Sequence, residues 1–353
     1  MNTKPADPAG GSRDSLRRSP PAGPASPAAG RAARGGAVLP APDGARAGLA
    51  IETKGLTKCY GARTVVDGLD LEVPAGVIAG FVGPNGAGKT TTLRMLLGLV
   101  SPTAGEGRVL GVALTEPADY LPDVGALIES PAFYPGLSGQ RNLAVQAALA
   151  GIDPGWIPAV LGRVGLGGRG TDPYKTYSLG MKQRLGIAAA LLGEPALLIL
   201  DEPANGLDPA GIRDMRELLR SLNQNGATVF VSSHLLGEVQ QVCDWLVVID
   251  QGRRRYQGPT GNLVAGGDVV VVGCQSAADL PTLEKLLARR GLHATRRGDR
   301  LSVELARAGN INEAVAEISR IAAAEHLTLV ELSLTKATLE DSYLNLISGN
   351  PQP

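Results

Sequence analysis

The feature that most constrains this chain is a glycine-rich turn between an apolar run and a helical pattern. The turn consists of Gly83, Pro84, Asn85, Gly86, Ala87, Gly88, Lys89 and Thr90, and it fits G-x-x-x-x-G-K-[ST]. The apolar residues 77–82 predict a buried strand before it, and residues 91–97 predict a helix after it. Such a turn curls backbone N–H groups around an anion and aims the positive end of the helix at it. We therefore expect an α/β fold that binds phosphate.

The residues at the end of the turn indicate which phosphate compound binds. Lys89 is placed to reach the terminal phosphates of a nucleoside triphosphate, and the Thr90 hydroxyl is placed to ligate Mg²⁺. Thr91, in the first turn of the predicted helix, is a further candidate contact. The alternative is a purely structural glycine turn, which the strand before it and the helix after it disfavour. The pattern identifies the class of ligand but not the task of the protein.

Composition excludes several other functions. The 353-residue chain has a formal net charge of zero and 3% aromatic residues, so it offers neither the basic field nor the stacking platform of a nucleic-acid-binding protein. Its three cysteines are scattered without a C-x-x-C pattern, which argues against a zinc site or a disulfide framework and fits a reducing cytosol. The most apolar stretch, residues 185–200, is interrupted by Glu194 and Pro195, so we expect no membrane span.

Composition and pattern divide the chain into three parts. Residues 1–48 are rich in Ala, Pro, Gly, Ser and Arg and predict a disordered tail. Residues 49–260 alternate strand and helix patterns, which predicts a mostly parallel sheet with its ligand at the carboxyl ends of the strands. Residues 267–353 follow the order β-α-β-β-α-β, which suggests a small α+β ferredoxin-like domain.

A second pattern places two carboxylates at the end of a buried strand. Residues 197–200 are all aliphatic and are followed by Asp201 and Glu202. From a strand end, Asp201 is able to reach the Mg²⁺ held by Thr90, and Glu202 is placed to polarise a water at the γ-phosphate. A solvated acidic turn is the alternative, and the apolar strand that delivers the pair makes it the weaker interpretation.

A third pattern, Tyr-Ser-Leu-Gly-Met at residues 177–181, precedes that strand. Ser178 is suited to cap the following helix, and Gly180 allows close backbone approach. The residues themselves leave two interpretations open, a capped helix and a second phosphate site at a helix N-terminus.

Taken together, these motifs resemble the ATP-binding cassette family, and specifically a nucleotide-binding subunit of an ABC transporter, over about residues 51–258. The resemblance implies a P-loop NTPase domain with a parallel sheet core, an antiparallel β subdomain and a helical subdomain at about residues 130–190. In that family Ser178 and Gly180 would contact the γ-phosphate bound by the partner subunit, so that two subunits enclose two ATP molecules. The commonest family form is Leu-Ser-Gly-Gly-Gln, from which Leu179 and Met181 depart.

The resemblance also assigns residues that their surroundings alone do not. Tyr60 corresponds to the aromatic residue that stacks on adenine, although by itself it reads as an ordinary core or surface tyrosine. Asp208 ends the segment that links the two sites across the dimer, and His234 matches the histidine that holds the γ-phosphate. Glu129 stands where most members carry a glutamine that touches Mg²⁺, and a carboxylate is also a suitable ligand.

The expected function is ATP hydrolysis with Mg²⁺, in which Lys89 stabilises charge and Glu202 acts as general base or orients the water. The resemblance implies a homodimer bound to a separate transmembrane permease, cytoplasmic and peripheral on the inner face of the membrane, without nucleic acid. Residues 128–135 and 339–343 look like bacitracin- and lantibiotic-type exporters, so a drug, antibiotic or peptide is the expected cargo. A soluble ATPase acting on DNA or ribosomes, and a regulatory ABC protein, are the alternatives.

Overall fold

The computed structural model describes residues 48–129, 132–263, 269–304, 311–335 and residue 343. The predicted disordered tail therefore lies, except for residue 48, outside the described residues. The same holds for most of the segment 339–347 that the sequence predicts to be a final helix. Within the described ranges, no helix is both long and apolar enough to cross a bilayer.

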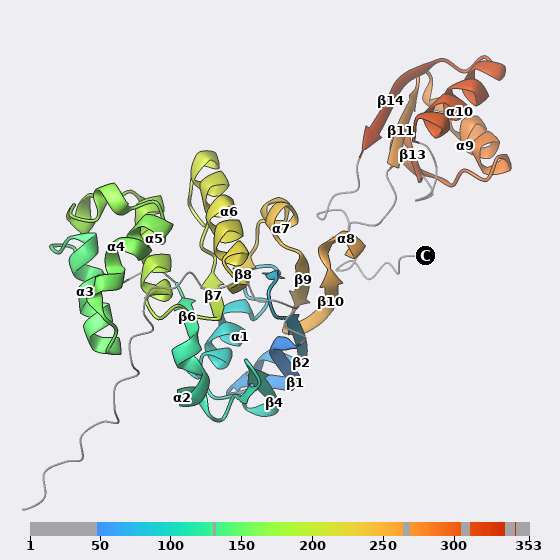
Figure 1. Cartoon of the computed structure of the whole chain (residues 1–353). Helices are drawn as coiled ribbons and strands as arrows, with labels where there is room; N and C mark the ends of the chain where they lie inside the picture. Colours follow the sequence, from blue (N-terminus) through green and yellow to red (C-terminus); the bar gives the residue numbers. More distant parts are fainter. Residues whose placement is uncertain (1–47, 130–131, 264–268, 305–310, 336–342, 344–353) are drawn as a thin grey trace, which may run out of the picture. The chain divides into compact units, whose positions relative to one another are not determined.

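A six-stranded sheet forms the centre of residues 49–260, in the order β10-β9-β3-β8-β7-β6 (Figure 1). Strands β6, β7, β8, β3 and β9 run parallel to one another, and β10 pairs antiparallel with β9. Their bounds are β3 Ile78–Val82, β6 Val124–Leu127, β7 Leu197–Asp201, β8 Thr228–Ser233, β9 Trp245–Asp250 and β10 Arg253–Pro259. Every residue of β3 and β7 is buried, as expected for central strands covered on both faces. The predicted, mostly parallel sheet is confirmed.

Both faces of this sheet are packed, because successive side chains of a strand point to opposite sides. On β7, Leu197 and Ile199 belong to one hydrophobic cluster, and Leu198 and Leu200 belong to the other. The first cluster also contains side chains of α1 (Lys89–Leu96) and of a second, antiparallel sheet described below. The second cluster contains those of the helices α3 (Gly139–Ala150), α5 (Leu179–Leu191) and α6 (Pro209–Gln224).

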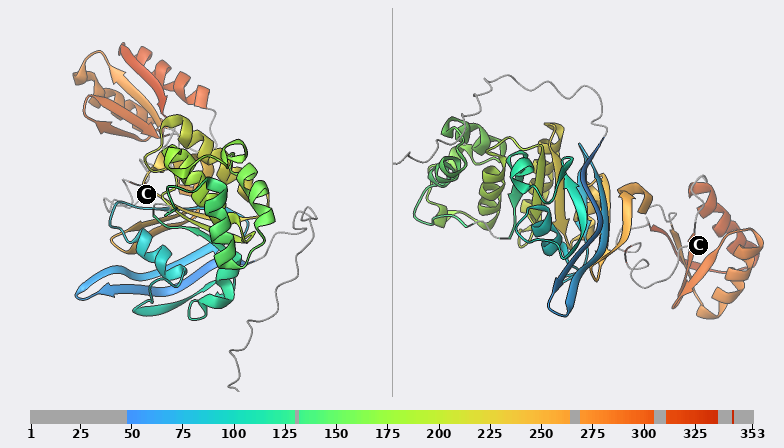
Figure 2. Two further views of the ribbon diagram at one scale, coloured as in Figure 1. Left: turned by 90° about the vertical axis from the view of Figure 1, so that its left-hand side faces the viewer. Right: turned by 90° about the horizontal axis from the view of Figure 1, so that it is seen from below.

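A four-stranded antiparallel sheet has the order β2-β1-β4-β5. Its strands are β1 Leu49–Tyr60, β2 Arg63–Pro74, β4 Ala104–Val109 and β5 Val112–Ala113, and the two long strands are blue in Figure 2. The sequence predicts two short strands at residues 65–66 and 69–73, whereas the structure has one continuous strand, β2. Register shifts between β1 and β2, together with Gly68 at φ 58°, accommodate the irregularity that interrupts the sequence pattern.

The helical subdomain contains α3 Gly139–Ala150, α4 Ile157–Arg163 and α5 Leu179–Leu191, which lie together in Figure 1. Short 3-10 turns accompany them at η2 Pro154–Trp156, η3 Gly167–Arg169 and η4 Tyr174–Thr176. The sequence pattern predicts helices at 139–151, 154–164 and 180–192, and the structure confirms them to within a few residues. Outside this subdomain, residues 49–263 contain α1 and the further helical elements α2 Pro117–Tyr120, η1 Leu121–Asp123, α6 Pro209–Gln224, α7 Leu236–Val242 and α8 Thr260–Leu263.

The C-terminal elements form a third sheet with its own core. Strands β11 Val269–Cys274, β12 Ala294–Arg297, β13 Arg300–Glu304 and β14 Leu329–Thr335 pair antiparallel in the order β12-β13-β11-β14. Between them lie η5 Ala277–Asp279, α9 Leu280–Arg289 and α10 Ile311–Ala324. Val270, Leu283 and Ile318 are fully buried in one cluster, so both helices pack on the same sheet. The predicted order β-α-β-β-α-β is thereby confirmed for the described elements.

Candidate functional site

The glycine-rich turn connects the end of β3 to the start of α1, and several of its positions have no room for a side chain. A Cβ on Gly83 would lie 2.4 Å from the Ile249 carbonyl oxygen, and one on Gly88 would lie 2.8 Å from that of Val65. Gly86 and Gly88 also have φ values of 82° and 102°, which side chains disfavour. Gly88 caps α1 without a side-chain bond, and the first turn has no acidic residue. The helix N–H groups therefore remain available for an anion.

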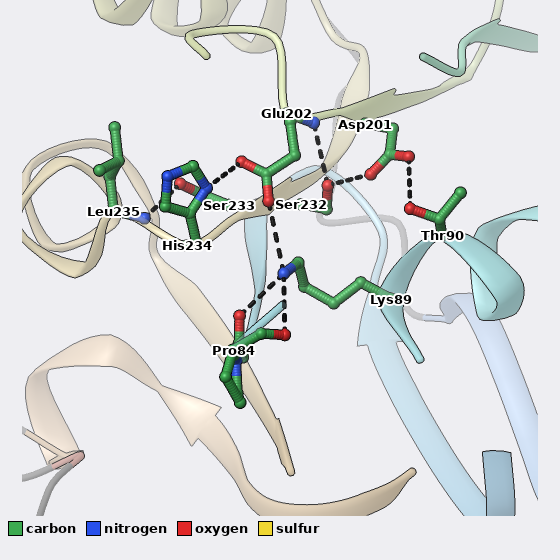
Figure 3. Close-up of polar contacts among 10 residues, drawn as sticks. Pro84, Lys89, Thr90, Asp201, Glu202, Ser232, Ser233, His234 and Leu235 are labelled. Carbon is green, nitrogen blue, oxygen red and sulfur yellow. Dashed lines mark hydrogen bonds and ion pairs between the residues drawn. The ribbon is translucent and has the colours of Figure 1, made fainter. Parts of the chain in front are cut away.

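Lys89 lies over this turn and is nearly buried. Its side chain is 7% exposed, and Nζ donates to the carbonyl of Gly83 at 2.8 Å and to that of Pro84 at 3.4 Å (Figure 3). The ammonium group also forms an ion pair with Oε1 of Glu202 at 3.4 Å. The positive charge is thus held between the phosphate-binding turn and the acidic strand end.

Asp201 joins the turn to the strand end through hydroxyl groups. The Thr90 Oγ1 donates to Oδ2 of Asp201 at 2.8 Å, and the Ser232 hydroxyl donates to Oδ1. Asp201 is buried, and Ser232 is its neighbour across the parallel β7–β8 pair. A carboxylate beside a hydroxyl supplies the hard oxygen donors that Mg²⁺ prefers. Among the residues that the structure describes, no group of three or more His, Cys, Asp or Glu side chains is placed to hold a metal ion.

Glu202 has an unusual backbone conformation that aims its carboxylate. Its φ is 49°, in the left-handed region, and its N–H donates to Ser232 Oγ at 2.9 Å. Oε2 lies 2.7 Å from Nδ1 of His234, which directly follows β8 (Figure 3). Non-glycine residues in this region are uncommon and collect at functional sites. The structure therefore brings Lys89, Thr90, Asp201, Glu202 and His234 into one connected group.

Tyr60 stands apart from this group as the last residue of β1. It is 49% exposed, and Nζ of Lys58 lies 5.1 Å from the centre of its ring. Lys58 is itself fixed by donating to the Ser101 carbonyl at 2.7 Å. An exposed aromatic ring supported in this way is suited to stacking.

The three residues predicted to act across a dimer occupy exposed or half-exposed helix starts. Ser178 caps α5 and accepts from the Met181 N–H at 3.3 Å. Gly180 is the second residue of α5, where an added Cβ would meet only Leu207, at 3.7 Å. Asp208 caps α6 and accepts from the Gly211 N–H at 2.9 Å. The capped-helix interpretation of Ser178 is confirmed, and its contact with phosphate stays a prediction.

Glu129, the residue in the usual glutamine position, pairs with a neighbour that the sequence analysis missed. It follows β6 with φ 60°, its side chain is 63% exposed, and its carboxylate forms an ion pair with Arg94. Arg94 lies on α1 four residues after Thr90, and therefore on the same face of that helix. The contact of Glu129 with a metal stays a prediction. Because Arg94 follows Thr90 by four residues in a predicted helix, the sequence could have placed Arg94 beside the expected Mg²⁺ ligand.

These features define the class of protein, a P-loop ATPase in which one buried lysine and one strand-end carboxylate face each other over the phosphate-binding turn. The sequence model for the ABC transporter family matches residues 66–205. The bacitracin transport ATP-binding protein of Enterococcus faecalis is 38% identical over 304 residues, which cover 85% of this chain and 96% of that protein. The chain belongs to the ABC transporter family as an ATP-binding subunit with ATPase activity.

Further relatives and solved structures agree with this assignment. The daunorubicin/doxorubicin resistance ATP-binding protein of Streptomyces peucetius is 38% identical over 314 residues, covering 86% of this chain and 93% of that protein. A solved ATP-binding subunit of an ABC transporter is 26% identical with a TM-score of 0.54, covering 76% of this chain and 99% of its own. The ADP conformation of another ATP-binding cassette has a TM-score of 0.56 at 21% identity, covering 60% and 91%, and supports the fold.

Proposed function

We propose that this chain energises an exporter whose membrane permease is a separate protein, and that the cargo is a drug, an antibiotic or a peptide. The observation that carries the proposal is the connected group of Lys89, Glu202 and His234 beside the phosphate-binding turn. The cargo class is supported by relatives named for bacitracin, lantibiotic and daunorubicin/doxorubicin transport or resistance.

The proposed hydrolysis uses groups whose positions are already set. The turn N–H groups and Lys89 bind the β- and γ-phosphates, so the triphosphate replaces Glu202 as the partner of the Lys89 ammonium. The carboxylate, held by His234, then orients the attacking water and accepts its proton. His234 also contacts the γ-phosphate. Thr90 and Asp201, with Glu129 as a third candidate, would hold Mg²⁺, which when bound neutralises charge on the phosphates.

We propose a homodimer as the active unit. Ser178, Gly180 and Asp208 lie at helix starts outside the connected group. Helix N-termini favour anions, which supports their use on the nucleotide of a second subunit. In this arrangement each site borrows half of its contacts, and hydrolysis depends on dimer formation.

The docking surface for the permease is proposed on the helical subdomain, at about residues 130–176. Phe133 packs edge-on against Tyr174 with ring centres 5.3 Å apart, while Tyr134 is 62% exposed. Asn142, 1% exposed, binds both the N–H and the carbonyl of Tyr134 and so fixes how this ring is presented. Such a contact would place the chain on the inner face of the membrane.

For residues 267–353 we propose a ferredoxin-like accessory domain that senses a ligand or regulates the dimer. The antiparallel order β12-β13-β11-β14, with both helices in one core, supports the fold assignment. Residues 1–48 are proposed as a tail and residues 49–260 as the ATPase domain. Removing residues 267–353 should change either dimer formation or the stimulation of ATPase activity by candidate cargo, and no change in either would refute the regulatory role.

The test of the main proposal compares the wild type with Glu202→Gln, using Glu217→Gln on the exposed side of α6 as the matched control. Wild type and control should hydrolyse ATP, whereas Glu202→Gln should bind ATP and dimerise without turnover, measured by phosphate release and light scattering. Equal hydrolysis by all three proteins would rule out the role of Glu202. Co-purification with ribosomes or DNA instead of a membrane protein would overturn the transporter proposal.

A further inference from the structure

His234 is carried by a segment with little packing of its own. The helix that follows it, α7, has only seven residues, and Val239 is its one buried residue. Helices of this length are not stable by themselves, so contacts with other elements must fix α7 in place.

Two arginines of α6 provide such contacts at opposite ends of α7, which lies beside α6 in Figure 1. Arg216 Nε lies 3.1 Å from Oε2 of Glu238, in the first turn of α7. One turn further along α6, Arg220 donates to the carbonyl of Gln241, in the last turn of α7. A cation at a helix C-terminus and an acidic residue at its N-terminus both agree with the helix dipole.

The first of these contacts is the better buried. The side chains of Arg216 and Glu238 are 16% and 28% exposed, and the two paired atoms are themselves buried. In the described part of the chain, neither atom has a hydrogen bond of good geometry, so the ion pair is what compensates each charge. Removing one partner would leave the buried atom of the other without its compensating charge, which is unfavourable.

A small cavity lies between this ion pair and Glu202 of the connected group. It has a volume of about 30 Å³ and is lined by apolar side chains, including Met215, Leu219 and Val239, together with Arg216, Glu238 and Glu202. An unpaired Glu238 would regain water most easily by an outward shift of α7. Since His234 lies two residues before α7, the same shift would separate its ring from Glu202.

We propose that Arg216 is a positioning residue for ATP hydrolysis. Through its ion pair with Glu238 it fixes α7 against α6 and thereby holds the His234 imidazole at the Glu202 carboxylate. Because Asp208 caps the start of α6, the same ion pair connects the segment proposed to face the second subunit to the residue proposed to contact the γ-phosphate. The inference rests on the proposed catalytic roles of Glu202 and His234.

The experiment measures ATP hydrolysis and ATP affinity of the full-length chain for Arg216→Met, Arg216→Lys and the control Arg213→Met. Arg213 lies exposed on α6, and no ion pair of this side chain is present among the described residues. Arg216→Met should lower kcat about tenfold and change KM less than about twofold. Arg216→Lys should keep most of the wild-type kcat, and the control should match the wild type. In a His234→Ala background, adding Arg216→Met should change kcat by less than about twofold.

Three results would overturn the inference while leaving the proposed role of His234 intact. They are an unchanged kcat in Arg216→Met, a full tenfold loss that persists in the His234→Ala background, and a parallel loss of ATP affinity and thermal stability that Arg216→Lys does not rescue. If Arg216→Met does not fold, Glu238→Gln replaces it with the same expected loss of kcat. If His234→Ala alone keeps full activity, the proposed catalytic role of His234 fails and the inference fails with it. That result is distinct from an impaired His234→Ala beside a fully active Arg216→Met.

Discussion

The ion pair between Lys89 and Glu202 predicts that Glu202→Gln binds ATP more tightly than the wild type. The charged atoms lie 3.4 Å apart, and the side chains are 7% and 22% exposed. At an effective dielectric constant of about 20, two unit charges at that distance attract by about 5 kcal/mol before desolvation is subtracted. ATP must displace this carboxylate from the lysine, whereas a neutral glutamine amide holds the lysine far less strongly.

Only part of that attraction reaches the binding constant. Lys89 is also held by the Gly83 carbonyl, Glu202 is also held by His234, and both charges regain some solvation when they separate. A net gain of about 1.4 kcal/mol, or about tenfold in Kd, is therefore expected for Glu202→Gln.

Calorimetric titration with a non-hydrolysable ATP analogue isolates binding from turnover. Glu217→Gln serves as the control, because it removes an equal charge from an exposed position on α6. An unchanged or weaker affinity in Glu202→Gln, with the control equal to wild type, would refute the conclusion that the carboxylate competes with phosphate for Lys89.

Three further predictions follow from burial and backbone geometry. Gly88→Ala should abolish ATP binding in a fluorescence titration, because the new Cβ would lie 2.8 Å from the Val65 carbonyl at φ 102°, and retained affinity would contradict the close fit. Asn142→Leu should lower the free energy of unfolding by about 1–3 kcal/mol in a urea titration, since it leaves partly buried backbone groups of the preceding loop unpaired, and an unchanged midpoint would argue against that role. Burial raises the pKa of the Cys243 thiol, so at pH 8, far below that raised pKa, Cys243 stays protonated and a thiol reagent should label Cys59 in the native protein and Cys243 only after unfolding. Mass spectrometry of the labelled peptides checks the last prediction, and fast native labelling of Cys243 would contradict it.

The sequence predicted structure best where the residues that determine a feature all lie in one short segment. The turn at residues 83–90 and the aliphatic residues 197–200 each carry their structure locally, because glycine spacing and unbroken burial depend on neighbours in the chain. The parallel sheet and the position of Lys89 could therefore be predicted. The cap at Ser178 was recognisable for the same reason, since capping involves residues three apart.

What the sequence could not show are the contacts between elements far apart in the chain. Ser232 meets Asp201 only because β7 and β8 pair in one particular register, and no local pattern specifies a register between strands 31 residues apart. Glu129 and Arg94 meet because β6 ends near the face of α1 that also carries Thr90. Such pairs depend on tertiary packing, which periodicity does not encode.

The strand order has a consequence for the width of the catalytic site. The strand β8 lies between β3, which leads into the phosphate-binding turn, and β7, which ends in the acidic pair. The two halves of the site are therefore separated by two strand spacings, about 10 Å in all. Long side chains and a triphosphate must span that distance, and Ser232, the next-to-last residue of β8, pairs with Phe81 of β3 on one side and with Asp201 of β7 on the other. Ser232 is small enough to leave the space open and polar enough to hold both Asp201 and the Glu202 backbone. A bulkier side chain in place of Ser232 would reduce the space between the phosphate-binding turn and the acidic end of β7, although the residues that bind phosphate would stay in place.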